Sequence, residues 1–335
     1  MIRYLSLFSG IGAFEKALTN LEIEYEVVNY CEIDKYASKS YSAIHGVSES
    51  KNLWDITKIN VVNLPTNIDL ITYGFPCQDI SLAGKQKGMF NDDGSLTRSG
   101  LFFKALDIIE YTKPKIAIAE NVKALTSKKF TKEFKIILES LEKAGYNNYW
   151  KVLNAKDYGI PQNRERVFIV SIRKDIDNNT FEFPKPYCLE KKLKNFLEAN
   201  VDEKYYLSDD QILKIVSWKA HQKPLEKVLG NKSIVPTITA RGAGANHSGM
   251  LLYSDTLEYT SNLQNKDKPK IRKLTPKECF RLMGFYDEDF EKVESIHVSN
   301  TQLYKQAGNS IVVNVLEEII YKLLGVLKNE RRNNN

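Results

Sequence analysis

Residues 4–15 read YLSLFSGIGAFE, and this stretch decides the fold class of the chain. The apolar run at residues 4–8 predicts a buried strand. Gly10 and Gly12 then allow a tight turn into a helix, with the backbone close enough to hold a ligand at the amino end of that helix. A strand, a glycine turn and a helix in this order are typical of the first unit of an α/β sheet that binds a small molecule.

The alternation of apolar runs with helical patterns continues to about residue 172. Further strands are predicted at residues 25–31, 69–73, 115–119, 150–153 and 167–172. Helices are predicted from residue 34, at 101–111 and at 131–144. Strands that alternate with helices predict an α/β fold, with a parallel, doubly wound, Rossmann-like sheet covered on both faces.

The chain changes character after about residue 183. As far as residue 271 it is rich in Lys, Asn, Ser and Gly, and its apolar segments are short and irregular. This composition predicts a smaller, loop-rich domain, either a simple appendage or a recognition domain on a small β scaffold. Helical patterns return after residue 275 and end in a helix at 311–327.

Charge and cysteine content narrow the class of protein. The net charge of +6 suits a polyanionic partner but does not require one. The four cysteines form no CxxC pair and the four histidines lack metal-ligand spacing, which argues against a disulfide scaffold and a metal site. No apolar stretch is long enough to span a membrane and the amino terminus lacks a signal-peptide pattern, so we expect a cytosolic protein.

Acidic residues lie beside the predicted strands at the glycine-turn end. Glu32 follows the second strand roughly 20 residues after the turn, where a carboxylate can accept both hydroxyls of a ribose. Because Glu15 replaces the third glycine of the dinucleotide pattern, a nucleoside without a pyrophosphate fits better than NAD. Asp55 and Ile56 can meet an adenine edge, although a helix cap is the simpler explanation for Asp55 alone.

A cysteine stands at the end of the third predicted strand, in GFPCQ at residues 74–78. A lone cysteine is usually a small core residue, but Cys77 falls at a strand end, where α/β sheets bind ligands. Glu120 ends the neighbouring fourth strand and should face Cys77; a surface glutamate that caps a helix is the alternative. Arg164 and Arg166 lead into the last strand, either in a structural salt bridge or at the site.

These motifs occur in a known order. The blocks FSGIGAFE, GFPCQDIS, ENV, QNRERVF, RKLTPKECFRLMGF and QAGNSIVVNV closely resemble the motif series of bacterial and phage DNA cytosine-5 methyltransferases, over about residues 1–172 and 272–325. The resemblance implies an enzyme that transfers a methyl group from S-adenosylmethionine to carbon 5 of a cytosine flipped out of double-stranded DNA. It also implies a role in restriction-modification or in orphan or phage methylation, without any metal.

The resemblance assigns catalytic roles to four residues. Cys77 would be the nucleophile that adds to carbon 6 of the cytosine. Glu120 would hold the N3 and amino edge of the ring and supply a proton. Arg166 would bind the exocyclic oxygen, with Arg164 nearby.

The resemblance also assigns cofactor-binding positions from both ends of the chain. These positions are Phe8, Gly10, Gly12, Glu32, Ile33, Asp55, Ile56, Pro76, Leu101, Asn309 and Ser310. Ile33 stands where some members place an aromatic residue against adenine, so stacking is reduced to apolar contact. A catalytic domain at 1–185, completed by residues 300–335, would then enclose a target-recognition domain at 186–299.

The loop from residue 78 to residue 100 resembles the catalytic loop of the family. Its glycines, together with Lys85, Lys87 and Arg98, suit a lid that closes over DNA and contacts the phosphates; a plain surface loop is the alternative.

The variable region contains PTITARGAGANH at residues 236–247. Thr237 and Ile238 match the pair that marks the recognition segment of the family. The donor-bearing residues that can read base edges or hold phosphates there are Arg241, Asn246 and His247.

Three other functions are compatible with parts of this pattern. A tRNA cytosine-5 methyltransferase shares the fold, but PCQ with a separate, glycine-rich recognition segment favours DNA. A catalytically idle DNA-binding protein would not need the set of Cys77, Glu120 and Arg166. An NAD-dependent oxidoreductase would need the third glycine. We therefore expect a monomeric DNA methyltransferase, with any cognate restriction endonuclease acting separately.

Overall fold

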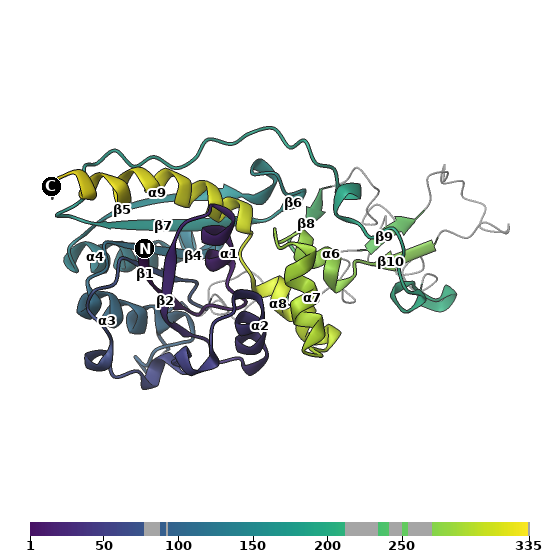
Figure 1. The fold of residues 1–335 in the computed structure, drawn as a ribbon, viewed down its shortest axis with the longest axis horizontal. Helices are drawn as coiled ribbons and strands as arrows, with labels where there is room; N and C mark the ends of the chain where they lie inside the picture. Colours follow the sequence, from purple (N-terminus) through teal and green to yellow (C-terminus); the bar gives the residue numbers. More distant parts are fainter. Residues whose placement is uncertain (77–87, 92, 212–233, 241–249, 254–269, 334–335) are drawn as a thin grey trace. The chain divides into compact units, whose positions relative to one another are not determined.

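The computed structural model describes residues 1–76, 88–91, 93–211, 234–240, 250–253 and 270–333 (Figure 1). No helix in these described segments is long and apolar enough to cross a membrane.

The chain forms two compact units. The first comprises residues 1–154, 165–186 and 311–335, and the second comprises residues 155–164 and 187–310. Residues 155–164 and 300–310 belong to the second unit, although the predicted boundaries assigned them to the first.

The first unit is built on a six-stranded sheet. Its strands are β1 (Ile2–Leu7), β2 (Tyr25–Cys31), β3 (Leu70–Tyr73), β4 (Ile116–Val122), β5 (Tyr146–Asn154) and β7 (Glu165–Arg173). They lie in the order β2-β1-β3-β4-β7-β5. The first four pair in parallel, as predicted, whereas β7 pairs antiparallel with both β4 and β5.

The direction of β7 corrects the expectation of a wholly parallel sheet. The segment between β5 and β7 contains no α-helix. A parallel return would need a crossover connection of a dozen or more residues, usually helical, so the chain turns back instead. As a result β7 starts beside the carboxyl end of β4, where Val122 pairs with Arg166.

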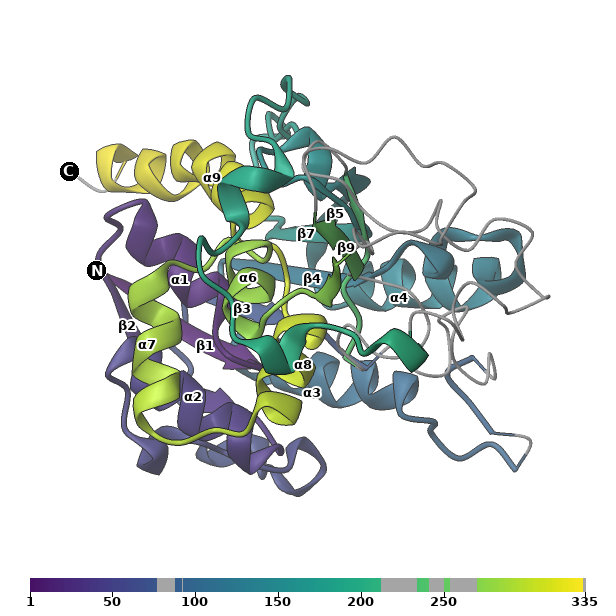
Figure 2. The ribbon, with the colours of Figure 1, turned by 90° about the vertical axis from the view of Figure 1, so that its right-hand side faces the viewer.

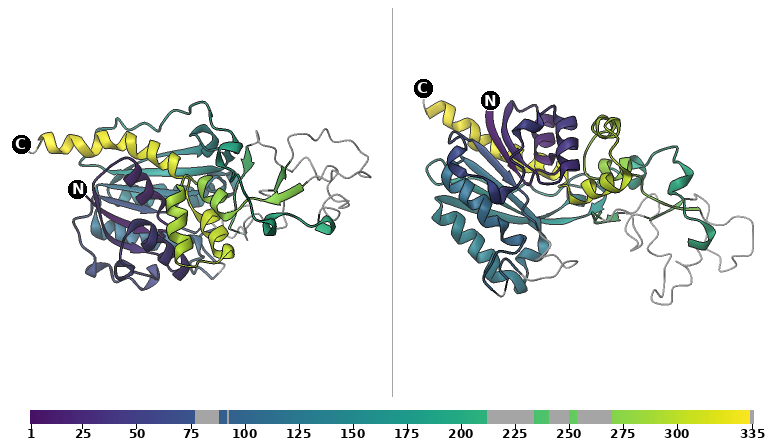
Figure 3. Two further views of the ribbon diagram at one scale, coloured as in Figure 1. Left: turned by 45° about the vertical axis from the view of Figure 1, so that its right-hand side comes forward. Right: turned by 90° about the horizontal axis from the view of Figure 1, so that it is seen from below.

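Helices cover both faces of this sheet, as the doubly wound fold requires (Figure 3). They are α1 (Ala13–Asn20), α2 (Lys35–His45), α3 (Phe102–Thr112), α4 (Thr131–Lys143) and α9 (Val313–Asn333). Helices α1 and α9 pack on each other on one face, and α3 and α4 pack on the other.

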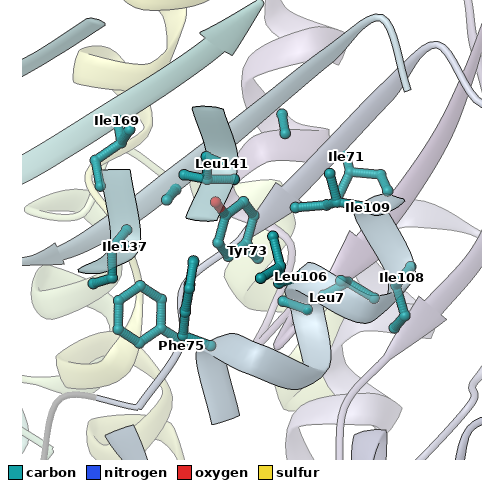
Figure 4. Packing of buried hydrophobic residues seen from close by; sticks show 14 of the residues in the cluster. Leu7, Ile71, Tyr73, Phe75, Leu106, Ile108, Ile109, Ile137, Leu141 and Ile169 are labelled. Atoms are coloured by element: carbon teal, nitrogen blue, oxygen red, sulfur yellow. The ribbon is translucent and has the colours of Figure 1, made fainter. Parts of the chain in front are cut away.

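An apolar core fills the space between the sheet and α3 and α4 (Figure 4). Tyr73 and Phe75, at the end of β3, lie in this core together with Leu106 of α3 and Leu141 of α4. The core therefore fixes the backbone that leads towards residue 77.

Most element ends agree with the sequence patterns, but β5 is longer than expected. The pattern predicted a strand at 150–153, whereas β5 runs from Tyr146 to Asn154 at the edge of the sheet. An antiparallel edge strand exposes one side, so its polar residues, such as Asn147 and Lys151, hid the strand in the sequence.

The described residues of the second unit contain two short strand pairs and three α-helices, α6, α7 and α8, which are labelled in Figure 2. The strands are β6 (Gln162–Asn163), β8 (Val235–Pro236), β9 (Met250–Tyr253) and β10 (Lys270–Lys273), and the helices are α6 (Pro276–Arg281), α7 (Asp287–Ser295) and α8 (Asn300–Asn309). Strands β6 and β8 pair in parallel, and β9 and β10 pair antiparallel. A β scaffold was predicted for this unit.

A fully buried ion pair organises the helical part of the second unit. The guanidinium of Arg272 donates to both carboxylate oxygens of Glu278, at 2.8 Å and 2.7 Å. Glu278 also accepts the backbone N–H of Thr275, which caps α6, and the backbone N–H of Glu198. Because one carboxylate satisfies several buried donors, β10, α6 and residue 198 are held together.

A buried carboxyl group lies on the α1 side of the sheet. Glu15, in the first turn of α1, is 1% exposed and accepts a hydrogen bond from the Tyr41 hydroxyl at 2.7 Å. Burial raises the pKa of Glu15 more than its hydrogen bonds with Ser6 and Tyr41 lower it. Burial therefore disfavours the charged form of this carboxyl group relative to that of an exposed glutamate.

We predict that Glu15→Gln makes stability less dependent on pH. The pKa of Glu15 is higher in the folded protein than in the unfolded chain, so protonation of Glu15 stabilises the folded state. This contribution to the free energy of unfolding is fully present below the unfolded-state pKa. It is lost as pH rises through the folded-state pKa. Urea unfolding between pH 5 and 9 should show the variant gaining stability relative to the wild-type protein as pH rises. Glu110→Gln, at an exposed glutamate of α3, is the control and should follow the wild-type curve. Parallel curves for Glu15→Gln and wild type would contradict the prediction.

Candidate functional site

The glycine turn after β1 requires glycine at two positions. Gly10 and Gly12 have φ angles of +57° and +81°, in the left-handed region that other residues avoid. A side chain at Gly12 would also place its Cβ 2.1 Å from Nε2 of His45, whereas a Cβ at Gly10 would meet no atom within 4 Å. The turn therefore leaves open space at Gly10 and is tightly packed at Gly12.

Glu32 connects this turn to the start of α2. Its Oε2 accepts the Gly10 N–H and its Oε1 accepts the Asp34 N–H, both at 2.8 Å. Asn52 holds the Glu32 backbone through its Oδ1 at 3.0 Å and its Nδ2 at 2.9 Å. A carboxylate accepts about four hydrogen bonds, so these contacts are compatible with ribose binding by the same group.

Three other residues assigned to the cofactor, Ile33, Asp55 and Ile56, belong to the first unit. Ile33 is 69% exposed, and Ile56 is buried in the apolar core. Asp55 caps a short 3-10 helix, because its Oδ1 accepts the Thr57 N–H at 3.0 Å and the Thr57 hydroxyl at 2.7 Å. These bonds to Thr57 lower the pKa of Asp55. The simpler interpretation of Asp55, as a cap, is thus observed.

Phe8 and Leu101 both pack against the apolar core from partly buried positions. Phe8 leaves β1 with a φ of +52°, which starts the turn. Pro76 follows directly on the buried Phe75. Asn309 and Ser310 belong to the second unit, where Asn309 is exposed and Ser310 is buried.

One further group in the turn fits a polar ligand. The hydroxyl oxygen of Ser9 is buried and makes no hydrogen bond to any residue that the structure describes. A buried hydroxyl usually has a partner, because leaving it unpaired costs about 1–3 kcal/mol. Together with the open space at Gly10 and the carboxylate of Glu32, this hydroxyl suits a nucleoside cofactor that carries polar groups beyond its ribose.

The predicted catalytic carboxylate lies at the carboxyl end of β4. Oε1 of Glu120 lies 3.0 Å from Nε of Arg166, and the two side chains are only 12% and 16% exposed. Oε2 of Glu120 lies 3.6 Å from where a Cβ on Gly74 would stand. The antiparallel β7 thus brings the arginine to the carboxylate, and both lie beside the chain that leaves β3.

Asn121 fixes that chain. Its side chain is 2% exposed and donates from Nδ2 to the carbonyl oxygen of Phe75 at 3.0 Å. Its Oδ1 accepts the N–H of Val122 at 2.9 Å. Asn121 therefore holds the backbone two residues before Cys77. The motif ENV contains this residue, but its spacing gave no sign of such a contact.

Arg164 occupies a different place from Arg166. It belongs to the second unit and is 4% exposed. Its guanidinium donates to the carbonyl oxygens of Ile238, Gly308 and Ser310. Backbone carbonyls are structural partners, so these contacts favour a positioning role, and a direct role in catalysis stays a prediction.

The start of the recognition segment is anchored in the same unit. The Thr237 hydroxyl donates to the Asn163 carbonyl at 2.8 Å. The Ile238 N–H donates to the side chain of Gln162 at 3.0 Å. Gln162 is a second contributor that the sequence pattern did not single out, although it begins the block QNRERVF.

Several predicted residues lie outside the described part of the chain. They are Cys77, Lys85, Lys87, Arg241, Asn246 and His247. Arg98 is described and is exposed at the start of the 3-10 helix Ser99–Leu101. In the described segments, no group of three or more His, Cys, Asp or Glu side chains is arranged to hold a metal ion.

The carboxyl end of the predicted lid is anchored to the core. Met89 is fully buried in the apolar cluster, and its carbonyl accepts the Thr97 N–H at 3.0 Å. Phe90 and Leu96 pair with each other in an isolated antiparallel β-bridge. A Cβ at Gly100 would lie 2.4 Å from the backbone carbonyl oxygen of Met89. Met89, Thr97 and Gly100 are therefore held against one another at the core, and the role of the loop as a lid stays a prediction.

A family model described as C-5 cytosine-specific DNA methylase matches residues 2–325. The chain belongs to this DNA methylase family. The match includes the variable region at about residues 183–271, which the motif blocks did not cover.

Curated relatives of the methylase cover nearly all of its length. The orphan methyltransferase M.SPBetaI of Bacillus phage SPbeta is 34% identical, over 98% of this chain and 99% of the relative. The type II methyltransferase M.HhaI of Haemophilus parahaemolyticus is also 34% identical, over 96% of this chain and 94% of the relative.

Solved structures share the fold at lower sequence identity. The methyltransferase EhMeth of Entamoeba histolytica has a TM-score of 0.77 at 22% identity, covering 98% of this chain and 99% of that one. The Dnmt2 methyltransferase of S. pombe has a TM-score of 0.72 at 21% identity, covering 98% of this chain and 100% of that one. These likenesses confirm the Rossmann-like α/β class.

We predict that Asn121→Ala slows methyl transfer with little effect on cofactor affinity. The Phe75 carbonyl loses a buried donor, which should lower the free energy of unfolding by about 1–3 kcal/mol. A shift of the chain that leads to Cys77, the predicted nucleophile, should also reduce the single-turnover rate by about tenfold or more. Rapid-quench methylation and calorimetry with S-adenosylhomocysteine measure the two effects separately. A normal single-turnover rate would show that Asn121 does not position the site.

Proposed function

We propose that Cys77 of this DNA cytosine-5 methyltransferase is the nucleophile, and that Glu120 and Arg166 activate the cytosine ring. The observation that carries the proposal is the ion pair between Glu120 and Arg166, with its 3.0 Å separation. It lies beside Gly74, at the end of the strand that leads to Cys77. A carboxyl group and a guanidinium at this place suit the N3 edge and the exocyclic oxygen of cytosine.

The chemistry needs such an arrangement because carbon 5 of cytosine is a weak nucleophile. The Cys77 thiolate forms a bond to carbon 6 while Glu120 donates a proton to N3, and the resulting enamine is nucleophilic at carbon 5. S-adenosylmethionine, when bound, supplies the methyl group. A base then removes the proton from carbon 5, and the bond between sulfur and carbon 6 breaks to restore the ring.

Residues of the glycine turn and the neighbouring loops would hold the cofactor. Glu32 would accept the ribose hydroxyls, and Phe8 and Ile33 would contact the adenine. The Ser9 hydroxyl would donate to a polar group of the cofactor; its burial without a partner in the described chain supports this role. Asn309 and Ser310 would also contact the cofactor.

The second unit would recognise the target sequence. Thr237 and Ile238 begin the recognition segment, and Arg241, Asn246 and His247 would contact base edges or phosphates. Lys85, Lys87 and Arg98 would contact the phosphates of duplex DNA. The net charge of +6 suits this partner. We further propose a monomer in the cytosol that serves an orphan, phage or restriction-modification role, with any endonuclease acting separately.

Methylation of duplex DNA and of tRNA, measured side by side with the purified protein, tests the substrate. Transfer to DNA alone supports the proposal, and transfer to tRNA alone would overturn it. Bisulfite sequencing of the methylated DNA then identifies the target.

We predict a covalent adduct between Cys77 and a target duplex that carries 5-fluorocytosine. Fluorine leaves no removable proton at carbon 5, so elimination fails after methyl transfer. A denaturing gel should show a shifted band that requires S-adenosylmethionine and is lost in Cys77→Ala. Cys188→Ala, at an exposed cysteine, is the matched control and should keep the band. Active enzyme without any adduct would rule out covalent catalysis.

We predict that Glu32→Ala weakens binding of S-adenosylmethionine more than binding of DNA. Loss of hydrogen bonds to a charged acceptor should cost roughly 1.5–3 kcal/mol of binding free energy, as measured by calorimetry. Glu26→Ala is the control, because Glu26 lies on β2, which ends one residue before Glu32, and pairs with Arg3 at 2.9 Å. Unchanged cofactor affinity in Glu32→Ala would refute the ribose role.

A further inference from the structure

Two buried side chains form hydrogen bonds with the backbone N–H and carbonyl of Ile238, where the recognition segment begins. Its N–H donates to Oε1 of Gln162 at 3.0 Å, and its carbonyl accepts from Nη1 of Arg164 at 2.8 Å. Gln162 is fully buried and Arg164 is 4% exposed. Both polar backbone groups of one residue are therefore held by side chains of a single short segment.

The same guanidinium holds the end of α8. Nη2 of Arg164 donates to the carbonyl oxygen of Gly308 at 3.1 Å and to that of Ser310 at 2.7 Å. One planar fork thus spans the recognition segment and the segment that carries Asn309 and Ser310. A lysine in its place would have a single charged nitrogen instead of a rigid fork.

These two backbone segments are also in direct contact. A Cβ at Gly308 would lie 2.1 Å from the carbonyl carbon of Thr239 and 2.2 Å from the nitrogen of Ala240. Contact this close leaves no room for one segment to shift while the other stays in place.

We propose that Arg164 is a positioning residue that couples recognition of the target sequence to binding of the cofactor. The inference rests on the proposed function, in which residues after Thr237 read DNA and Asn309 and Ser310 reach the cofactor. A correct target that holds the recognition segment in place then also holds Ser310 in place, through one guanidinium. Coupling of this kind is reciprocal, so the cofactor also tightens binding of the correct target.

The test compares cofactor affinity in the presence of right and wrong DNA. The target duplex is the one found by bisulfite sequencing, and the wrong duplex differs by one base pair. Calorimetry with S-adenosylhomocysteine should give the wild-type enzyme an affinity about fivefold or more higher with the target than with the wrong duplex. In Arg164→Lys this ratio should fall to about one.

Arg272→Lys is the matched control, because Arg272 is a buried arginine of the same unit that pairs with Glu278 instead. It should lower stability but keep the wild-type ratio. If Arg164 had only a structural role, Arg164→Lys would also lower stability and keep the wild-type ratio of cofactor affinities. A wild-type ratio in Arg164→Lys would therefore overturn the proposal. A wild-type ratio of one would also overturn it, even if methylation of the target proves that the proposed function is correct.

A measurement on the wild-type protein covers the case in which Arg164→Lys does not fold. Hydrogen exchange of the peptide that contains residues 234–240 is followed with and without S-adenosylhomocysteine. The Ile238 N–H donates a hydrogen bond to the side chain of Gln162. The proposal predicts that this N–H exchanges more slowly when S-adenosylhomocysteine is bound. Unchanged exchange would contradict the coupling.

Discussion

The largely buried ion pair between Glu120 and Arg166 depends on β7, the strand of the six-stranded sheet that is antiparallel to its neighbours. In the register of β4 and β7, Val122 pairs with Arg166 and Glu120 pairs with Phe168. The amino end of β7 therefore meets the carboxyl end of β4, and the arginine reaches the carboxylate at 3.0 Å. A parallel β7 would carry Arg166 to the opposite edge of the sheet. Each charge would then be buried without the other, at a cost of about 3–5 kcal/mol.

The parallel strands β1, β3 and β4 complete this arrangement. Their carboxyl ends meet at one edge of the sheet, where parallel α/β sheets bind ligands. The glycine turn leaves β1, and Gly74 follows β3 next to Glu120. Asn121 then ties the end of β4 to Phe75. Within the first unit, the glycine turn that we propose for the cofactor and the ion pair that we propose for activation of the cytosine thus lie at one edge of the sheet, because the strands share one direction.

The sequence predicted the parts of the fold that follow from local patterns. Strand β2 has the predicted bounds, since a buried strand next to turn residues gives a clear signal. The direction of β7 was missed because a local pattern identifies a strand but not its orientation. The missing helix between residues 154 and 165 is the only sequence feature that could have indicated it.

The residues of the site were predicted unevenly for similar reasons. Glu120 and Arg166 were each assigned to the site, and the structure pairs them at 3.0 Å, whereas their catalytic roles stay predictions. Arg164 was grouped with Arg166 because both stand in the block QNRERVF and the resemblance places them near each other. Strand β7 begins only at Glu165, however, so Arg164 precedes it and belongs to the other unit. The side chains of Asn121 and Gln162 contact backbone groups that are distant in the sequence. Such contacts depend on tertiary structure, so no pattern of residue spacing in the sequence predicts them.

The central claim is that Glu120 and Arg166 activate the ring for addition of Cys77, before any methyl transfer. Release of tritium from carbon 5 of a labelled target cytosine, in the absence of the methyl donor, reports this addition alone. The account predicts that Arg166→Lys and Glu120→Gln each slow this exchange by about tenfold or more, which corresponds to about 1.4 kcal/mol of activation free energy. Exchange at the wild-type rate in both variants, with methylation still impaired, would contradict it.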